Sequence, residues 1–142
     1  MSTEEVDFID GFALLLNQWG MPMAAARLYA YLHMRSEPVS LDRIAADLEI
    51  SKSNACGAAK ALESFGSARR LTERGSKRIL YVAGDKPGES LRRQTELLGK
   101  MSALIFAKKD AVTSGAANDR LGRLAQFHHD LRQAMEVTIA AA

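Results

Sequence analysis

The sequence predicts a mainly α-helical protein with one small β-hairpin, and two features of its pattern lead to this expectation. Apolar residues recur at three- and four-residue spacing through most of the chain, which is typical of amphipathic helices. After residue 66 this spacing gives way to two short β-prone runs around a glycine-containing turn. We therefore expect an N-terminal domain, residues 1–85, that ends with the hairpin, and a helical region, residues 86–142.

Composition is that of an ordinary globular chain. With 142 residues, 47% of them hydrophobic and 25% charged, the chain can bury a core, which excludes wholesale disorder. One cysteine cannot form an intramolecular disulfide or a cysteine-based zinc site, so a reducing compartment fits best. The start is acidic, unlike a signal peptide, and no run reaches the roughly 18 apolar residues of a membrane span. We expect a cytoplasmic protein that is not in a membrane.

Two helices are expected first. Thr3 is the expected N-cap of the first, and Gly20 the residue that ends it. Its wide apolar face consists of Phe8, Ile9, Phe12, Leu15, Leu16 and Trp19. The second helix is expected over residues 23–34, with Ala25, Leu28, Tyr29 and Leu32 on one side.

Two short helices joined by a very brief turn come next. Ser40 and Ser51 are the expected N-caps, and only Glu49 and Ile50 separate the two helices. Helices joined in this way must cross steeply, which is the helix-turn-helix arrangement. In the second of them, the inward residues are expected to be Ala55, Ala59, Leu62 and Phe65.

A hairpin and two long helices complete the chain. Strands are expected over residues 68–72 and 79–82, followed by a linker over 84–88. The long helices are expected over 89–113 and 118–140. Their apolar stripes lack the strict heptad of a coiled coil, so we expect a helical bundle between two subunits, which the first helix could join.

Charge is unevenly distributed along the chain. Residues 1–49 carry a net charge of −5 and residues 83–142 of +2, whereas residues 50–82 carry +5. The positive segment contains the second helix of the helix-turn-helix and the hairpin. A helix-turn-helix followed by a β-hairpin is the arrangement called a winged helix-turn-helix. Such a helix fits the major groove of DNA, which is about 12 Å wide. The expected DNA-binding residues are Ser51, Lys52, Ser53, Asn54, Cys56, Gly57, Lys60, Arg74, Lys77 and Arg78.

A family resemblance agrees with this interpretation. The run LDRIAADLEISKSNA at residues 41–55 resembles the helix-turn-helix of MarR-type transcriptional regulators. GMP at 20–22, ARLYAYL at 26–32 and LESFGSARR at 62–70 are similar to their GbsR-like branch. The resemblance covers residues 8–85.

The resemblance implies a dimeric, sequence-specific DNA-binding regulator, in most members a repressor, with effector control in some. It implies DNA contacts for the matching residues Lys52, Ser53, Asn54, Arg74 and Lys77. Glu49 stands where the family usually has glycine. Two-fold pairing would place two recognition helices about 34 Å apart and require a pseudo-palindromic operator.

Three smaller signals each have two interpretations. Cys56 is either a redox-sensing thiol near a helix N-terminus or a small residue at the DNA face. Arg69 and Arg70 point to opposite faces of their strand, so at most one is expected to face DNA. The aromatic residues Phe12, Trp19, Tyr29 and Tyr31 either line a pocket for a quaternary ammonium effector or simply pack in the core.

Other chemistries find little support. Adjacent His128 and His129 point about 100° apart on a helix, and no ligand set completes a metal site. No catalytic motif is present, so we expect no enzyme, no cofactor and no metal. The rival hypothesis is a winged-helix module that binds a protein partner. A large apolar residue on the exposed helix face would have favoured it, and the sequence has none there.

Overall fold

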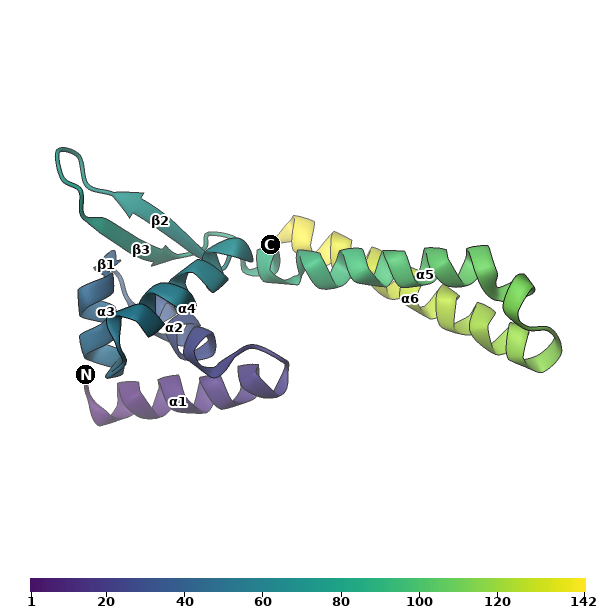
Figure 1. The fold of residues 1–142 in the computed structure, drawn as a ribbon, viewed down its shortest axis with the longest axis horizontal. Coiled ribbons are helices and arrows are strands. Elements are labelled where there is room, and N and C mark those ends of the chain that lie inside the picture. The colour runs from purple at the N-terminus through teal and green to yellow at the C-terminus, as the bar shows by residue number, and fades with distance from the viewer. The chain divides into compact units, whose positions relative to one another are not determined.

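A computed structural model describes residues 1–142 of the chain, which divides into two compact units, Met1–Asp85 and Lys86–Ala142 (Figure 1). The first unit combines four helices with a three-stranded antiparallel sheet, and the second consists of helices alone. The predicted fold class, mainly α-helical with a small winged hairpin, is confirmed. None of the helices is both long enough and apolar enough to cross a membrane.

The elements of the first unit follow the predicted order. They are α1 (Thr3–Gln18), α2 (Met23–Met34), β1 (Val39–Ser40), α3 (Leu41–Leu48), α4 (Lys52–Ser64), β2 (Ala68–Thr72) and β3 (Ile79–Ala83). The expected bounds of α2 are confirmed, and Ser40 and Ser51 cap α3 and α4 as predicted. The two-residue strand β1 was not predicted, because so short a segment has no alternation to detect.

Local hydrogen bonds set both ends of α1. The N-cap is Ser2 rather than the predicted Thr3, because Ser2 and Glu5 form a reciprocal capping box. At the other end, Gly20 has a φ of 104°, and its N–H donates to the carbonyl of Asn17. The N–H of Met21 reaches back to Leu16, which completes a Schellman motif and confirms Gly20 as the terminating residue.

The apolar face of α1 is covered only along one edge. The helix packs on α2 and buries Ile9 and Ala13. Most of the predicted apolar face is left uncovered. The uncovered residues form a stripe at helical spacing, the α1 stripe, consisting of Phe8, Phe12, Leu15 and Trp19.

The core of the first unit lies where α2, α3, α4 and the sheet meet. Its largest wholly buried side chains are Tyr31, Ile9, Leu28, Ile44, Leu48 and Leu62. Ala55 and Ala59 are buried as predicted, and they allow α4 to approach α2 closely. Phe65 does not face inward as predicted: it is the C-cap residue of α4, and its side chain is exposed. Tyr31, outside the predicted stripe of α2, is wholly buried.

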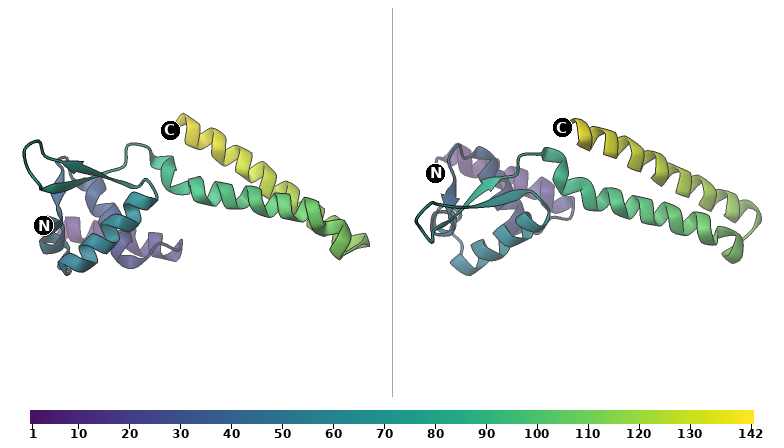
Figure 2. Two further views of the ribbon diagram at one scale, coloured as in Figure 1. Left: turned by 45° about the horizontal axis from the view of Figure 1, so that its top comes forward. Right: turned by 90° about the horizontal axis from the view of Figure 1, so that it is seen from above.

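The sheet has the strand order β1–β3–β2, and all neighbours are antiparallel. Strands β2 and β3 form the predicted hairpin, with Arg70 opposite Tyr81, and Figure 2 shows it extending from the helices. Gly66 and Gly84 hold its base against the end of α4. A side chain on Gly84 would lie 2.3 Å from the carbonyl oxygen of Gly66, so the close approach requires glycine there.

The second unit is a helical hairpin. A short 3₁₀ helix, η1 (Pro87–Leu91), leads into α5 (Arg92–Val112), and α6 (Gly115–Ala141) returns beside it, as both views in Figure 2 show. Helix α6 begins at Gly115, three residues before the predicted start. Asn118 therefore lies inside it, and its side chain joins the two helices through Asp110 and Lys109.

Candidate nucleic-acid interface

The N-terminus of α4 is exposed and ordered by its own cap. The hydroxyl of Ser51 accepts a hydrogen bond from the N–H of Asn54 at 3.0 Å. The Ser51 side chain therefore caps the helix. Lys52, Ser53 and Asn54 are all exposed in the first turn. The N–H groups of Lys52 and Ser53 are left without partners in the helix, and with the helix dipole they attract an anion such as a phosphate.

The outward face of α4 continues with small and basic residues. Gly57 and Lys60 are exposed, and Cys56 is half-buried as the one free thiol of the chain. A side chain added at Gly57 would meet no atom within 4 Å, so this position lies open. The face therefore carries no bulky group that would keep the helix backbone away from the edges of bases.

The turn between α3 and α4 contains the one non-glycine residue with positive φ. Glu49 has φ 55° and ψ 46°, the left-handed conformation that glycine adopts without steric cost. The N–H of Ile50 donates to the carbonyl of Ala45 and closes the end of α3. The turn thus has a left-handed residue at Glu49, a position that glycine would occupy without strain.

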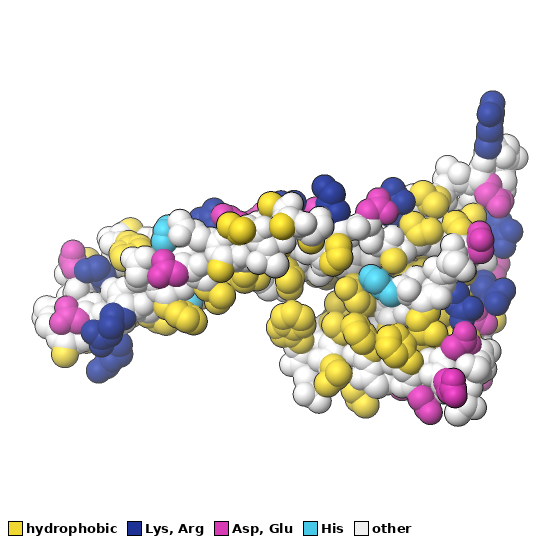
Figure 3. All heavy atoms as spheres, turned by 180° about the vertical axis from the view of Figure 1, so that it is seen from behind, with side chains coloured by type: hydrophobic (Ala, Val, Ile, Leu, Met, Phe, Trp, Pro, Cys, Tyr) yellow, Lys and Arg dark blue, Asp and Glu magenta, His cyan; other side chains and the backbone are white.

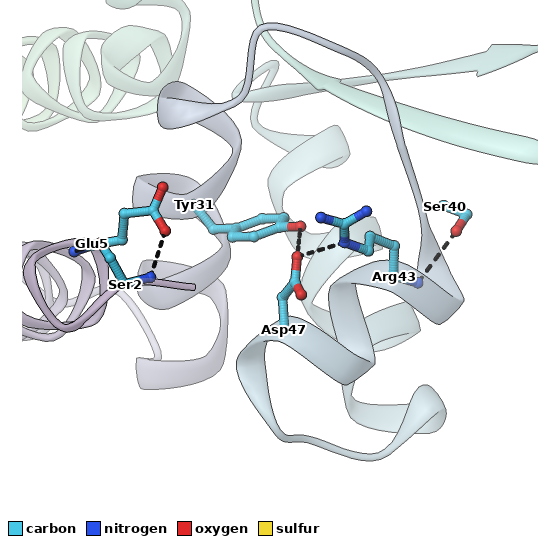
Figure 4. Close-up of polar contacts among 6 residues, drawn as sticks. All are labelled: Ser2, Glu5, Tyr31, Ser40, Arg43 and Asp47. Carbon is cyan, nitrogen blue, oxygen red and sulfur yellow. Dashed lines mark hydrogen bonds and ion pairs between the residues drawn. The ribbon is translucent and has the colours of Figure 1, made fainter.

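A polar network at the edge of the core orients α3 against α2 (Figure 4). The hydroxyl of Tyr31 donates to Asp47 Oδ2 at 2.6 Å, and Arg43 Nε donates to the same oxygen at 2.8 Å. Ser40 completes the arrangement by accepting from the N–H of Arg43 at 3.2 Å. Because α4 follows α3 after a short turn, this network also helps to set the direction of the candidate DNA-binding helix.

The network changes the acidity of its members. Burial raises the pKa of Tyr31, and the hydrogen bond and charge of Asp47 raise it further. Burial alone would raise the pKa of Asp47, but hydrogen bonds from Tyr31 and Arg43 outweigh it and hold this pKa below its usual range. The same carboxylate raises the pKa of the Arg43 guanidinium. At neutral pH, Asp47 is therefore an anion held by two donors.

The hairpin tip carries exposed basic side chains. Arg74, Lys77 and Arg78 lie around the turn, none of them forms an ion pair within the chain, and Gly75 has the positive φ that the turn needs. Lys60 on α4 is also without an ion pair. These four charges are available to an anionic partner without first breaking an internal bond.

The other three basic residues of the positive segment 50–82 pair with acids of the first unit. Lys52 lies 3.0 Å from Asp42, a contact at the start of α3 and α4. The remaining two pairs are Arg69 with Asp85 at 3.1 Å and Arg70 with Glu63 at 3.2 Å. All three are surface pairs, each worth up to about 1 kcal/mol, so a phosphate can replace the carboxylate at little cost.

The predicted effector residues do not form one cluster. Phe12 and Tyr29 stack with ring centroids 6.0 Å apart, and Tyr29 also contacts the ring of His33. Tyr31 is wholly buried, and the Arg35 guanidinium lies 4.7 Å from its ring centroid. Trp19 is 77% exposed at the end of α1. The structure thus brings Phe12 and Tyr29 together, while Tyr31 faces other neighbours.

Sequence reasoning missed the polar network. The Arg43–Asp47 spacing of four residues is a visible signal, because such pairs share a helix face. Nothing in the sequence marks Tyr31 or Arg35 as its neighbours. No group of three or more histidine, cysteine, aspartate or glutamate side chains is arranged to hold a metal ion.

One solved structure shares this fold over nearly its whole length. A crystal structure described as a transcriptional regulator matches 97% of this chain and 97% of its own, with a TM-score of 0.77 and 17% identity. Two more distant structures also align. The transcriptional regulator Tm0710 from Thermotoga maritima has a TM-score of 0.47 and 16% identity, and the alignment covers 96% of this chain and 92% of that protein. The transcriptional regulator SlyA has a TM-score of 0.44 and 13% identity, and the alignment covers 95% of this chain and 94% of that protein. No family model and no curated protein matches the sequence. The first match shows that this chain has the fold of a protein described as a transcriptional regulator.

Proposed function

We propose that the chain is a sequence-specific DNA-binding transcriptional regulator of the MarR type, in its GbsR-like branch, that binds a pseudo-palindromic operator as a homodimer and represses transcription. The observation that carries this proposal is the outward face of α4. It starts with an exposed, anion-attracting helix N-terminus, continues with small and basic residues, and has no large apolar side chain.

Electrostatics supports the same partner. The cations on α4 and on the hairpin tip belong to the chain segment of highest positive charge, and four of them have no internal counter-ion. Neutralising DNA phosphates with such groups releases counterions, which makes affinity fall steeply as salt rises. Lys52, Ser53, Asn54 and Gly57 are the residues we assign to base edges and adjacent phosphates.

The homodimer is supported by apolar surface that the chain leaves uncovered. On α5 and α6 the exposed large hydrophobic residues are Leu97, Met101, Leu104, Phe106, Val112, Leu124, Phe127, Leu131 and Val137. The α1 stripe adds a second apolar surface, and Figure 3 shows apolar atoms gathered on both units. Surface of this kind is rare on monomers and typical of protein interfaces. A second copy of the chain is the partner that we assign to it.

The first test is DNA binding by the full chain. Fluorescence anisotropy with the duplex upstream of its own gene and with a scrambled duplex, over a salt series, measures affinity and preference together. We expect a steep salt dependence and a preference of about 10³ or more for the natural duplex. Equal binding to both duplexes would contradict a specific site there, and no binding near physiological salt would favour the protein-partner module instead.

Charge-reversal variants locate the interface. Lys60→Glu and Lys52→Glu are expected to weaken duplex binding at least about tenfold, because each replaces a phosphate attraction by repulsion. Lys108→Glu is the matched control, since Lys108 is an exposed lysine on α5 that forms no ion pair. Equal losses in all three variants would show that overall charge, and not the α4 face, determines binding.

The oligomeric state, and whether the protein represses or activates transcription, need separate measurements. Sedimentation of the full chain is expected to give a dimer, and Leu104→Glu to shift it toward monomer while the first unit stays folded. A reporter gene behind the bound duplex is expected to be silenced by the wild type and released in Lys60→Glu. Activation instead of silencing would overturn the repressor assignment alone.

A further inference from the structure

A cavity of about 540 Å³ lies in the first unit, away from the residues assigned above to base edges. It is lined by the end of α2, the loop to β1, the start of α3, Glu5 of α1, and the hairpin at Arg78. Three of its lining side chains are arginines: Arg35 and Arg43 come from neighbouring segments of the chain, whereas Arg78 comes from the hairpin, far along the sequence. Their convergence on one hollow is therefore a product of the fold.

Arg35 is the unusual member of this group. Its Nε and Nη2 atoms are shielded from solvent and have no hydrogen-bond partner. Its guanidinium lies over the ring of Tyr31, and the neighbouring carboxylate of Asp47 already accepts from Tyr31 and Arg43. Shielded N–H donors of a guanidinium that lack an acceptor are costly, since such donors are normally hydrogen-bonded.

Arg43 and Arg78 add donors that are not engaged elsewhere. Arg43 uses Nε for Asp47 (Figure 4), and its two Nη atoms form no ion pair of their own. Arg78 is exposed and forms no ion pair. Guanidinium groups with free paired N–H donors match the two oxygens of a carboxylate or phosphate.

Two acids also line the cavity. The Glu5 carboxylate accepts from the N–H of Ser2 in the capping box, at 2.8 Å, and so already serves the start of α1. Glu37 is exposed and forms no ion pair within the chain. Neither acid pairs with Arg35, so the lining keeps an excess of positive charge beside the one arginine that lacks an acceptor.

We propose that this cavity is an oxyanion site, in which Arg35, Arg43 and Arg78 bind a phosphate or carboxylate group. The occupant is either a free small anion or a phosphate of bound DNA, and both present the same oxygens to the guanidinium groups. The volume is within the range of small-molecule sites, so a free organic anion with one or two such groups can be accommodated.

The site is connected to the helix-turn-helix. An anion that binds the Nη atoms of Arg43 would pull this side chain toward the cavity and lengthen its bond to Asp47, which with Tyr31 fixes α3 against α2. Occupancy would thereby change the placement of α3 and of α4 behind it. This consequence for DNA affinity rests on the proposed function, whereas anion binding itself does not.

The first experiment uses DNA-free full-length protein and inorganic phosphate as the probe. Arginine Nε–H signals are followed by ¹H–¹⁵N NMR during a phosphate titration at constant ionic strength, with chloride as the reference anion. We expect a saturable shift of the Arg43 signal with a Kd below about 10 mM. Arg35→Gln is expected to weaken binding at least about tenfold, and Arg35→Lys less, because it keeps the charge without the paired donors.

Two further variants keep this test decisive. Arg78→Gln, whose side chain is exposed, is expected to weaken phosphate binding several-fold and stays informative if Arg35→Gln does not fold. Arg123→Gln on α6 is the matched control with the same charge change, and it should bind phosphate like the wild type. Equal binding in Arg78→Gln, Arg123→Gln and the wild type would overturn a free-anion site at this cavity.

A second experiment separates the two sources of the anion. Duplex affinity of Arg35→Gln is measured over a salt series without phosphate. No phosphate binding to the DNA-free wild type, together with weaker duplex binding and a salt slope reduced by about one, would identify a DNA phosphate as the occupant. No phosphate binding and unchanged duplex affinity in a folded Arg35→Gln would overturn the oxyanion site, and wild-type DNA binding would be unaffected by that outcome.

Discussion

The two units of the chain bury very different side chains. In residues 1–85 the wholly buried residues include tyrosine, isoleucine and leucine side chains drawn from four helices. In residues 86–142 the buried residues are Gly88, Thr95, Ser102 and Ala125, all of them small, while large apolar side chains on both helices stay exposed. A pair of helices has no third layer under which its apolar stripes can close.

The difference shows where each unit obtains its stability. The first unit has its own core, with a sheet and four helices around it, and can fold from its own contacts. The second unit buries little large apolar surface internally, and hydrophobic stabilisation scales with the apolar area removed from water. The large apolar side chains that it leaves exposed are the surface assigned to the homodimer proposed above.

The largest expected effect comes from separating the two units. A fragment of residues 1–85 is expected to unfold cooperatively, whereas a fragment of residues 86–142 is expected to show no cooperative transition when dilute and to gain helix with increasing concentration. Circular dichroism over a thermal scan at several concentrations measures both. Cooperative, concentration-independent unfolding of the second fragment would show that residues 86–142 are stable without a partner.

Truncations of two leucines sharpen the comparison at the level of single side chains. Leu62→Ala in the core of the first unit is expected to cost about 2–5 kcal/mol of the free energy of unfolding of residues 1–85. Leu104→Ala, at a side chain 62% exposed, is expected to leave that value unchanged and to weaken dimerisation of the full chain. Urea unfolding and sedimentation provide the two readouts. Similar loss of stability in both variants would mean that Leu104 is covered within one chain.

The Tyr31–Asp47 bond tests the polar part of the first unit. Tyr31→Phe is expected to cost about 1–3 kcal/mol at pH 7, because Asp47 loses a buried donor. Since the pKa of Asp47 is lowered in the folded state, its contribution is complete above its ordinary pKa, near 4, and is lost as pH falls below that value. Urea midpoints from pH 6 to pH 2.5 should therefore fall less steeply with acid in Tyr31→Phe. The same acid slope in both proteins would show that other carboxylates dominate.

The smallest expected effect concerns the turn between α3 and α4. Glu49→Gly is expected to stabilise the first unit by up to about 1 kcal/mol, because glycine adopts the left-handed conformation without strain. The gain is reduced by the greater conformational entropy of glycine in the unfolded chain. A thermal midpoint raised by a few degrees is the measurement. A lower midpoint would mean that the Glu49 side chain stabilises the turn by more than its strain.

Local features of the fold could be predicted because their causes lie within a few residues. The serine caps of α3 and α4, the glycine that ends α1 and the change of period at the hairpin each depend on neighbours in the sequence. The exposed face of α4 was predictable for the same reason, since helical spacing separates Ala55 and Ala59 from Gly57 and Lys60.

Tertiary structure alone decided which apolar faces are covered. The same three- and four-residue spacing marks Ile9, which is buried, and Trp19, which is exposed, because burial depends on whether another element packs there. It also decided that Tyr31 and Arg43, from different helices, share Asp47, and that Arg35 lies beside them without an acceptor. Spacing along one helix carries information only about that helix, whereas a cavity lined by distant segments exists only after they have packed.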